Sequence, residues 1–209
     1  MNLLSKAVLG GMFAACVATS AQAGTIIAST TGLASPVSTI TFDEIVLAQN
    51  TAVTNQYAGL GVSFSSLAYY SPQTGFGNVQ GNDVGNFSFA GGPDINPMTL
   101  TFTSLQSDVA FAIASNSTNY LFEAKLGGNL VDSFQSIVDT SSADYFGFTG
   151  LSFDSITITS LGPDRWVLDN IQLGSALTGV PEPATIALFG AGLAGLAARR
   201  RKMAKAAKA

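Results

Sequence analysis

The stretch Met98–Thr103 reads Met-Thr-Leu-Thr-Phe-Thr, with an apolar side chain at every second position and threonine between. Successive side chains of a β-strand point to opposite faces of the sheet, so this alternation predicts a strand with one face in a core and the other in water. Threonine is β-branched and favours strands, which strengthens the assignment.

The same pattern recurs along residues 24–174, and no convincing amphipathic helix interrupts it. Four further strands are expected, over residues 37–42, 109–113, 153–159 and 166–173. The segment from Tyr120 to Val131, broken by glycines 127 and 128, is a predicted hairpin. We therefore predict one all-β domain over residues 24–174, an antiparallel β-sandwich of the jelly-roll type.

Composition and charge exclude several classes of protein. Between residues 24 and 180 only Lys125 and Arg165 are basic, against twelve acidic residues, a net charge of −10. Such a domain is unsuited to binding nucleic acid or another anionic surface. The 209-residue chain has no histidine and a single cysteine, Cys16, which excludes a Ser-His-Asp triad, a histidine-ligated metal and a zinc cluster.

The first 23 residues are typical of a secretory signal peptide. A basic start at Lys6 precedes an uncharged apolar run over residues 7–18, and Ala21-Gln22-Ala23 forms a cleavage site. We expect cleavage after Ala23; lipidation at Cys16 is the weaker alternative. After cleavage at Ala23 the mature chain contains no cysteine, so disulfides do not stabilise it.

The last 35 residues form a linker and a three-part tail. Residues 175–180 are small and patternless, as in a flexible linker. The tail, residues 181–209, consists of three parts in order: Pro181, Glu182 and Pro183; an uncharged apolar stretch over 184–198; and a basic end over 199–208 that begins with Arg199, Arg200 and Arg201.

The apolar stretch is expected to form a short transmembrane helix. Fifteen helical residues span about 22 Å, less than the roughly 30 Å of a hydrocarbon core. Positive charge remains on the cytoplasmic side of a membrane, so the arginines would hold the C-terminus of the precursor in the cytoplasm and leave the domain outside.

These three parts closely resemble the PEP-CTERM sorting signal of Gram-negative bacteria, many of which carry exopolysaccharide gene clusters. The resemblance implies that an exosortase recognises the tail and cuts near Pro181–Pro183, which releases the domain to the cell surface or beyond it, in an exopolysaccharide matrix or biofilm. An ordinary C-terminal membrane anchor is the alternative. The resemblance implies sorting and export, and it implies no chemistry for the domain.

Two short motifs near the ends of the domain suggest a calcium site. Thr41-Phe42-Asp43-Glu44 and Leu168-Asp169-Asn170-Ile171 together resemble the terminal strands of jelly-roll carbohydrate-binding modules, in which an early acid and a late Asp-Asn share a structural calcium. The resemblance implies Asp43, Glu44, Asp169 and Asn170 as ligands, and Ca²⁺ prefers six to eight oxygen atoms. Ordinary solvated carboxylates at strand edges are the alternative.

Aromatic residues suggest a second kind of site. Sugars stack on exposed aromatic rings, and Tyr69, Tyr70 and Trp166 are the candidates for such a platform. Trp166 could instead be a core residue at the start of the last strand. The glycine-rich stretch 69–97 is interpreted either as a functional loop or as an excursion that forms partial strands.

The sequence favours a binding or structural protein over an enzyme. A glycosidase needs two acids about 5–10 Å apart, but the scattered candidates sit in no motif: Asp83, Asp94, Asp132, Asp139, Asp144 and Asp154. The leading prediction is an exported, non-catalytic surface or matrix protein associated with exopolysaccharide. A carbohydrate-binding module is the alternative, and a polysaccharide hydrolase or lyase is less favoured. Structural calcium is the one cofactor suggested.

Overall fold

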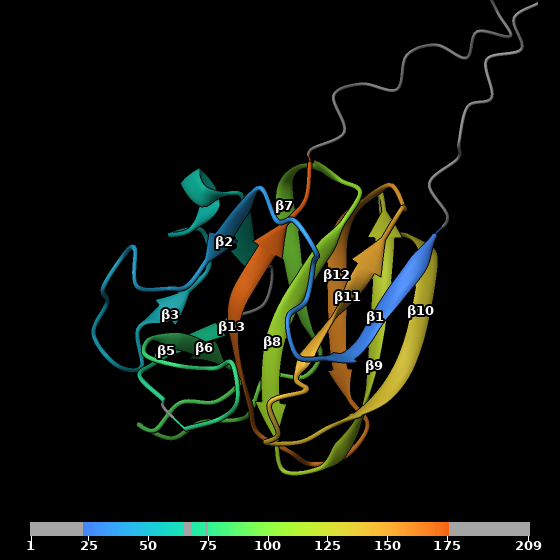
Figure 1. The fold of residues 1–209 in the computed structure, drawn as a ribbon. Helices are drawn as coiled ribbons and strands as arrows, with labels where there is room; N and C mark the ends of the chain where they lie inside the picture. Colours follow the sequence, from blue (N-terminus) through green and yellow to red (C-terminus); the bar gives the residue numbers. More distant parts are fainter. Residues whose placement is uncertain (1–22, 65–67, 74, 176–209) are drawn as a thin grey trace, which may run out of the picture.

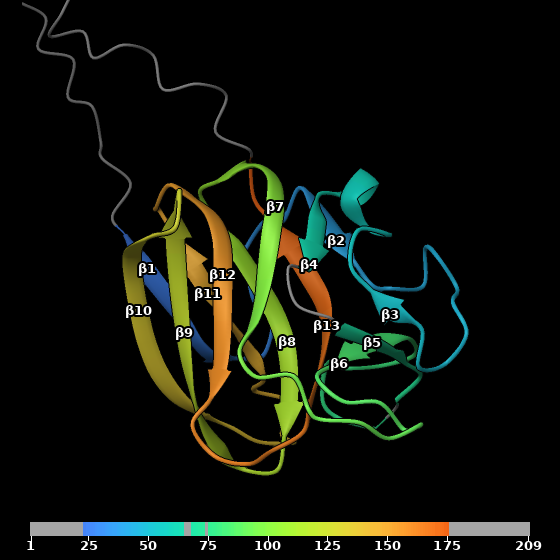
Figure 2. The same ribbon diagram turned by 180° about the vertical axis from the view of Figure 1, so that it is seen from behind.

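The computed structural model describes residues 23–64, 68–73 and 75–175. The signal peptide up to residue 22, most of the linker, and the tail with its expected apolar helix lie outside the described residues. Within them, two antiparallel sheets pack face to face (Figures 1 and 2), which confirms the predicted β-sandwich. No helix among the described residues is long and apolar enough to cross a membrane.

The large sheet contains eight strands, in the order β1 (Gly24–Ser29), β11 (Tyr145–Thr149), β8 (Val109–Ser115), β13 (Trp166–Leu173), β6 (Asp83–Gly85), β5 (Ala68–Ser71) and β3 (Ala52–Val53), with β2 (Ser38–Ile40) also paired to β13. The small sheet contains β10 (Asn129–Val138), β9 (Thr118–Leu126), β12 (Phe153–Ser160), β7 (Met98–Gln106) and β4 (Val62–Phe64). A short 3₁₀ turn, η1 (Ala58–Leu60), precedes β4.

From β6 onward the chain alternates between the two sheets, apart from the β9–β10 hairpin. The last strand, β13, lies in the middle of the large sheet between β8 and β6. The β9–β10 hairpin confirms the hairpin predicted from Tyr120 to Val131, and β13 confirms the strand predicted over residues 166–173. The strand predicted over 37–42 is shorter than expected, because Phe42 has a positive φ of 58° that takes the chain out of the sheet.

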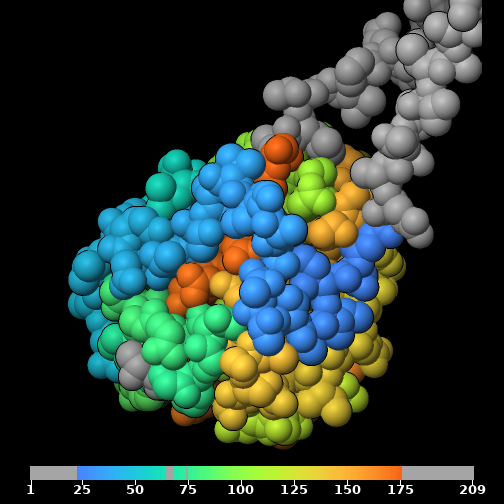
Figure 3. All heavy atoms as spheres, in the orientation of Figure 1, coloured from blue at the N-terminus to red at the C-terminus, as the bar shows by residue number. Residues whose placement is uncertain are grey.

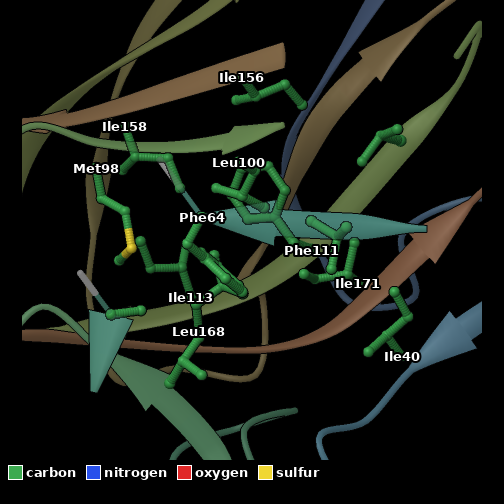
Figure 4. Packing of buried hydrophobic residues seen from close by; sticks show 14 of the residues in the cluster. Ile40, Phe64, Met98, Leu100, Phe111, Ile113, Ile156, Ile158, Leu168 and Ile171 are labelled. Atoms are coloured by element: carbon green, nitrogen blue, oxygen red, sulfur yellow. The ribbon is translucent and has the colours of Figure 1, made fainter. Parts of the chain in front are cut away.

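The core lies between the sheets, where the alternating residues of facing strands meet (Figure 4). The small sheet contributes Leu100, Ile156 and Ile158, and the large sheet contributes Phe111 and Leu168, among others. Each such side chain is buried, and full burial of an aliphatic or aromatic side chain contributes about 1.5–3 kcal/mol.

Stacked phenylalanines join the two sheets within this core. The ring of Phe122 on β9 lies 5.2 Å from that of Phe146 on β11, with an interplanar angle of 9°, and 4.9 Å from that of Phe134 on β10. Phe122 therefore contacts its own sheet and the opposite one, and substituting it would weaken both.

The outer face of the large sheet is covered by chain segments rather than by solvent. Ala110, Ala112 and Ala114 of β8 point outward, and their small side chains admit a second apolar layer that includes Val79 and Phe87. Figure 3 shows this face, with blue atoms of the N-terminal segment and green atoms of the segment after β5 lying over the strands. This second layer positions the candidate functional site.

Both ends of the described chain lie at the same end of the sandwich. Thr25 of β1 pairs with Phe148, which pairs with Val109, which pairs with Leu173 of β13, so one row of residues joins the first strand to the last. In Figure 1 this is the upper end, where β1 begins and β13 finishes. β8 finishes and β13 begins at the opposite, lower end.

Candidate functional site

An open hollow of about 120 Å³ lies on the outer face of the large sheet, at its lower end. We call it the outer hollow. Its lining combines aromatic, aliphatic and polar side chains: Gln73, Phe76, Phe87, Ala114, Ser115, Asn116, Thr140, Arg165, Trp166 and Val167. Ala114 of β8 and Val167 of β13 are direct register partners, and both belong to the outer apolar layer. The hollow forms because the smaller side chains of Ala114 and Val167 on the sheet lie between larger side chains, such as Phe76 and Phe87, that cover this face.

One wall of the outer hollow is an aromatic ring capped by a charge pair. The guanidinium carbon of Arg165 lies 5.0 Å from the centre of the Phe87 ring, within range of a cation–π contact. The Nε of Arg165 also donates to Asp94, 3.2 Å from Oδ1 and 3.3 Å from Oδ2. The Arg165 and Asp94 side chains remain 52% and 37% exposed, so both can still contact a ligand.

Asp164 holds the polar rim in place. Its carboxylate accepts hydrogen bonds from the backbone N–H and the side-chain amide of Asn116, each at 3.1 Å, and from the Ser115 hydroxyl. Burial raises the pKa of Asp164, but the hydrogen bonds from Ser115 and Asn116 outweigh it and hold this pKa below its usual value. The ionised side chain is therefore a fixed structural acceptor.

A row of buried polar side chains crosses the middle of this outer face. The β13–β6 ladder pairs Leu168 with Val84, so the next positions, Asp169 and Asp83, lie opposite each other, and Asp83 pairs with Ser71 on β5. We call these three residues the carboxyl row. Asp169 and Asp83 are 0% exposed, and the Asp83 Oδ1 and Ser71 Oγ atoms have no hydrogen-bond partner among the described residues.

The carboxyl row is electrostatically unusual. Burial, with a smaller contribution from the neighbouring Asp169, raises the pKa of Asp83 to about 8. Burial likewise raises the pKa of Asp169 to about 7, with a contribution from Asp43 and Glu44. The two basic residues of the domain are paired elsewhere, Lys125 with Glu123 and Arg165 with Asp94. Among the residues that the structure describes, the buried carboxyls thus have no cationic side chain to compensate them.

Three buried acids, Asp83 and Asp169 of the carboxyl row together with Asp144, hold the segment that supplies Phe76 to the outer hollow. The backbone N–H of Gln73 donates to Asp83 at 2.9 Å. The N–H of Gln80 donates to Asp169 at 3.0 Å, and that of Asn78 donates to Asp144 at 2.8 Å. We call residues 75–82 the covering loop. Each carboxylate takes up an N–H group that has no strand partner, so the acids fix the loop on the sheet.

The four residues predicted to bind calcium lie in one region, but their side chains have other partners. Glu44 accepts from the Thr41 backbone at 2.9 Å, and the Asn170 amide donates to the Asn78 carbonyl and to Asp169. Among the described residues, no group of three or more histidine, cysteine, aspartate or glutamate side chains is arranged to hold a metal ion. The four side chains therefore do not by themselves complete a calcium site, and calcium stays a prediction.

The expected aromatic platform is not formed by the residues named for it. Tyr70 and Trp166 are 2% and 1% exposed and belong to the main core, because each points to the inner face of its strand. Tyr69 is half-buried on the opposite face of β5. The aromatic residues that line the hollow are Phe76 and Phe87, from the glycine-rich stretch 69–97, together with the buried Trp166.

One signal in the sequence did point to the burial of Trp166. It lies two positions before Leu168 on the same strand, and residues two apart share a face. The stretch 69–97 forms two short strands, β5 and β6, and between them the covering loop. Of the scattered acids, Asp83 and Asp144 are buried, while Asp94 is the partner of Arg165.

The fold and the site together define a class: an acidic β-sandwich with an open, polar-rimmed hollow on its outer face. The family described as the PEP-CTERM protein-sorting motif matches residues 179–202, so the chain carries this sorting signal. The signal directs export across the inner membrane, and the protein reaches the cell surface or the extracellular space after processing.

Other comparisons add less. No curated protein matches the sequence. Among solved structures, the crystal structure of a cleaved adhesin domain of Lys-gingipain is similar, with a TM-score of 0.39 and 15% sequence identity, over 66% of this chain and 99% of the adhesin domain.

Proposed function

We propose that this protein is a non-catalytic surface or matrix protein that associates with exopolysaccharide through the outer hollow. The observation that carries the proposal is the position of the hollow, at the opposite end of the sandwich from the point where the chain leaves toward its sorting motif. A domain held through its C-terminus presents its far end to the surroundings.

The distance involved is large on the scale of the domain. β13 runs eight residues from Trp166, at the hollow, to Leu173, at the exit. At about 3.3 Å per residue, this strand separates the two ends by roughly 25 Å. A polymer at the hollow would therefore not collide with a membrane or surface that holds the residues after 175.

The state of the acidic residues favours binding over cleavage. Asp83 and Asp169 have pKa values near 8 and 7, in the range of a general acid. Both are 0% exposed beneath the covering loop, where no polymer can reach them. Asp94, the exposed acid beside the hollow, is paired with the lining residue Arg165 and is not itself part of the lining. We therefore propose no hydrolase or lyase activity.

The sorting tail identifies the protein that would act on the precursor. An exosortase would cut near Pro181–Pro183, while the arginines at 199–201 hold the C-terminus on the cytoplasmic side of the inner membrane. The processed domain would then remain at the cell surface or in the matrix, held through its new C-terminal end.

Cosedimentation tests the proposal. Mature protein purified from the producing cells is mixed with polysaccharide extracted from the same cells and centrifuged. We expect the protein in the pellet, with no new reducing ends after prolonged incubation. A pellet control without polysaccharide measures self-aggregation. Protein that stays in the supernatant refutes the association, and release of reducing ends refutes the non-catalytic assignment.

A further inference from the structure

We infer that the outer hollow binds an uncharged sugar ring carrying adjacent hydroxyl groups, with the Asp94–Arg165 pair as the hydroxyl clamp. This inference rests on the proposed function and deepens it by naming the chemistry of the ligand. Three features of the hollow support it: its apolar floor, its paired donor and acceptor, and its charge.

The apolar part of the hollow suits the C–H face of a sugar. Ala114 and Val167 form a floor without polar atoms in their side chains, and Phe76 and Phe87 contribute aromatic surface beside it. Phe76 is half-buried, so part of its ring remains open to a ligand. Aromatic surface of this kind provides apolar contact area at low conformational cost.

The polar part offers a donor and an acceptor side by side. A guanidinium carries five N–H donors, and Arg165 uses its Nε–H on Asp94, which leaves the terminal N–H groups. The Asp94 carboxylate accepts that bond and retains further lone pairs. Of two neighbouring hydroxyls on one ring, one can donate to Asp94 while the other accepts from Arg165.

The rim adds uncharged hydrogen-bonding groups. Asn116 and Thr140 are exposed, and Gln73 is half-buried. Asp164 fixes Asn116 through two hydrogen bonds, so this part of the rim is held in place before a ligand arrives. Amides and hydroxyls match the mixed donor and acceptor character of sugar hydroxyls.

Charge decides between neutral and acidic sugars. The one cation at the hollow, Arg165, is already neutralised by Asp94, and the ionised Asp164 lies next to it in the chain. The domain as a whole carries a net charge of −10 over residues 24–180. A sugar carboxylate would have to displace Asp94 against this field, whereas a neutral diol uses the pair as it stands.

The experiment uses the mature protein and the extracted polysaccharide, separated by anion exchange into a neutral and an acidic fraction. We expect cosedimentation with the neutral fraction that changes little between 50 and 500 mM salt. Arg165→Gln, Asp94→Asn and Phe76→Ala should each weaken binding at least tenfold. Thermal melting within a few degrees of the parent shows that each variant is folded.

Matched control variants lie outside the hollow. Lys125→Gln removes the ion pair to Glu123 on the small sheet, and Ile137→Ala shortens an exposed apolar side chain on the edge strand β10. Both should bind as the parent does. The inference is overturned if the hollow variants bind normally, or if only the acidic fraction binds. In either case the parent would still cosediment, so its association with exopolysaccharide would stand, while the assignment of the binding site to the hollow, or of the ligand as neutral, would fail.

Discussion

Raising the pH from 5 to 7 should destabilise the folded domain through the carboxyl row. In the unfolded chain Asp83 and Asp169 ionise near pH 4, whereas in the folded protein their pKa values are raised to about 8 and 7. Between these limits the unfolded chain has lost protons that the folded protein retains. Increasing pH therefore favours unfolding.

The expected size follows from the same values. Each carboxyl that is protonated only in the folded state changes the free energy of unfolding by about 1.4 kcal/mol per pH unit. Two such groups acting from pH 5 to 7 give a loss of about 5 kcal/mol, and the loss levels off above about pH 8. Asp139 and Asp164 have lowered pKa values, so they act at more acidic pH, outside this interval.

Urea unfolding provides the assay. Trp166 is the single tryptophan of the chain and is 1% exposed, so its fluorescence reports unfolding. Samples at pH 5, 6 and 7 contain EDTA, which prevents a cation from compensating the carboxyls. Equal free energies of unfolding at pH 5 and 7 would refute the reasoning.

A substitution separates the carboxyl row from other causes. Asp83→Asn keeps the shape of the side chain and removes one titrating group, so it should roughly halve the pH dependence and stabilise the protein at pH 7. Asp132→Asn, on the edge strand β10, removes a partly exposed acid and should leave the pH dependence unchanged. If the free energy of unfolding of Asp83→Asn depended on pH as strongly as that of the parent, the effect would come from groups other than Asp83.

Four further predictions concern packing, metal and processing. Gly147→Ala should unfold the domain or cost several kcal/mol in urea titration, because a Cβ there would overlap the Val109 carbonyl oxygen; parent-like stability would contradict this. Phe122→Ala should cost about 3–5 kcal/mol in the same titration, since it removes a ring stacked between both sheets. If calcium binds at Asp43 and Asp169, millimolar Ca²⁺ should raise the melting temperature by several degrees, and equal melting in EGTA would remove the idea. Mass spectrometry of the surface protein should show loss of the residues after 183, which an intact basic tail would disprove.

The strands were predictable because alternation is a local signal. Met98–Thr103 lies within β7 and buries every second side chain, as its alternation predicted. Residues 166–173 coincide with β13, where nearly every side chain is buried because a second layer covers the outer face of the sheet. Phe42 was not predictable in this way. Its pattern continues that of β2, but a positive φ ends the strand while the ring enters the core.

The candidate site was largely hidden from the sequence. The outer hollow combines residues near positions 75, 87, 115, 140 and 165, and only the register of β8, β13 and β6 brings them together. Phe76 and Phe87 lie in a stretch without periodicity, where no rule separates a core ring from a surface ring. The proximity of Asp43 to Asp169 was anticipated from the motifs, but the facing of Asp169 and Asp83 depends on a ladder between distant strands.

The central place of β13 has a consequence for the timing of secretion. A chain that crosses the membrane from its N-terminus delivers β13 last among the strands, so the large sheet lacks its middle strand until residue 173 has emerged. By then the sorting motif, which starts at residue 179, has arrived at the membrane. If the tail holds the precursor in the membrane, as we propose, the sandwich closes while it is still tethered, and the cut near Pro181–Pro183 then releases a finished domain rather than a half-built one.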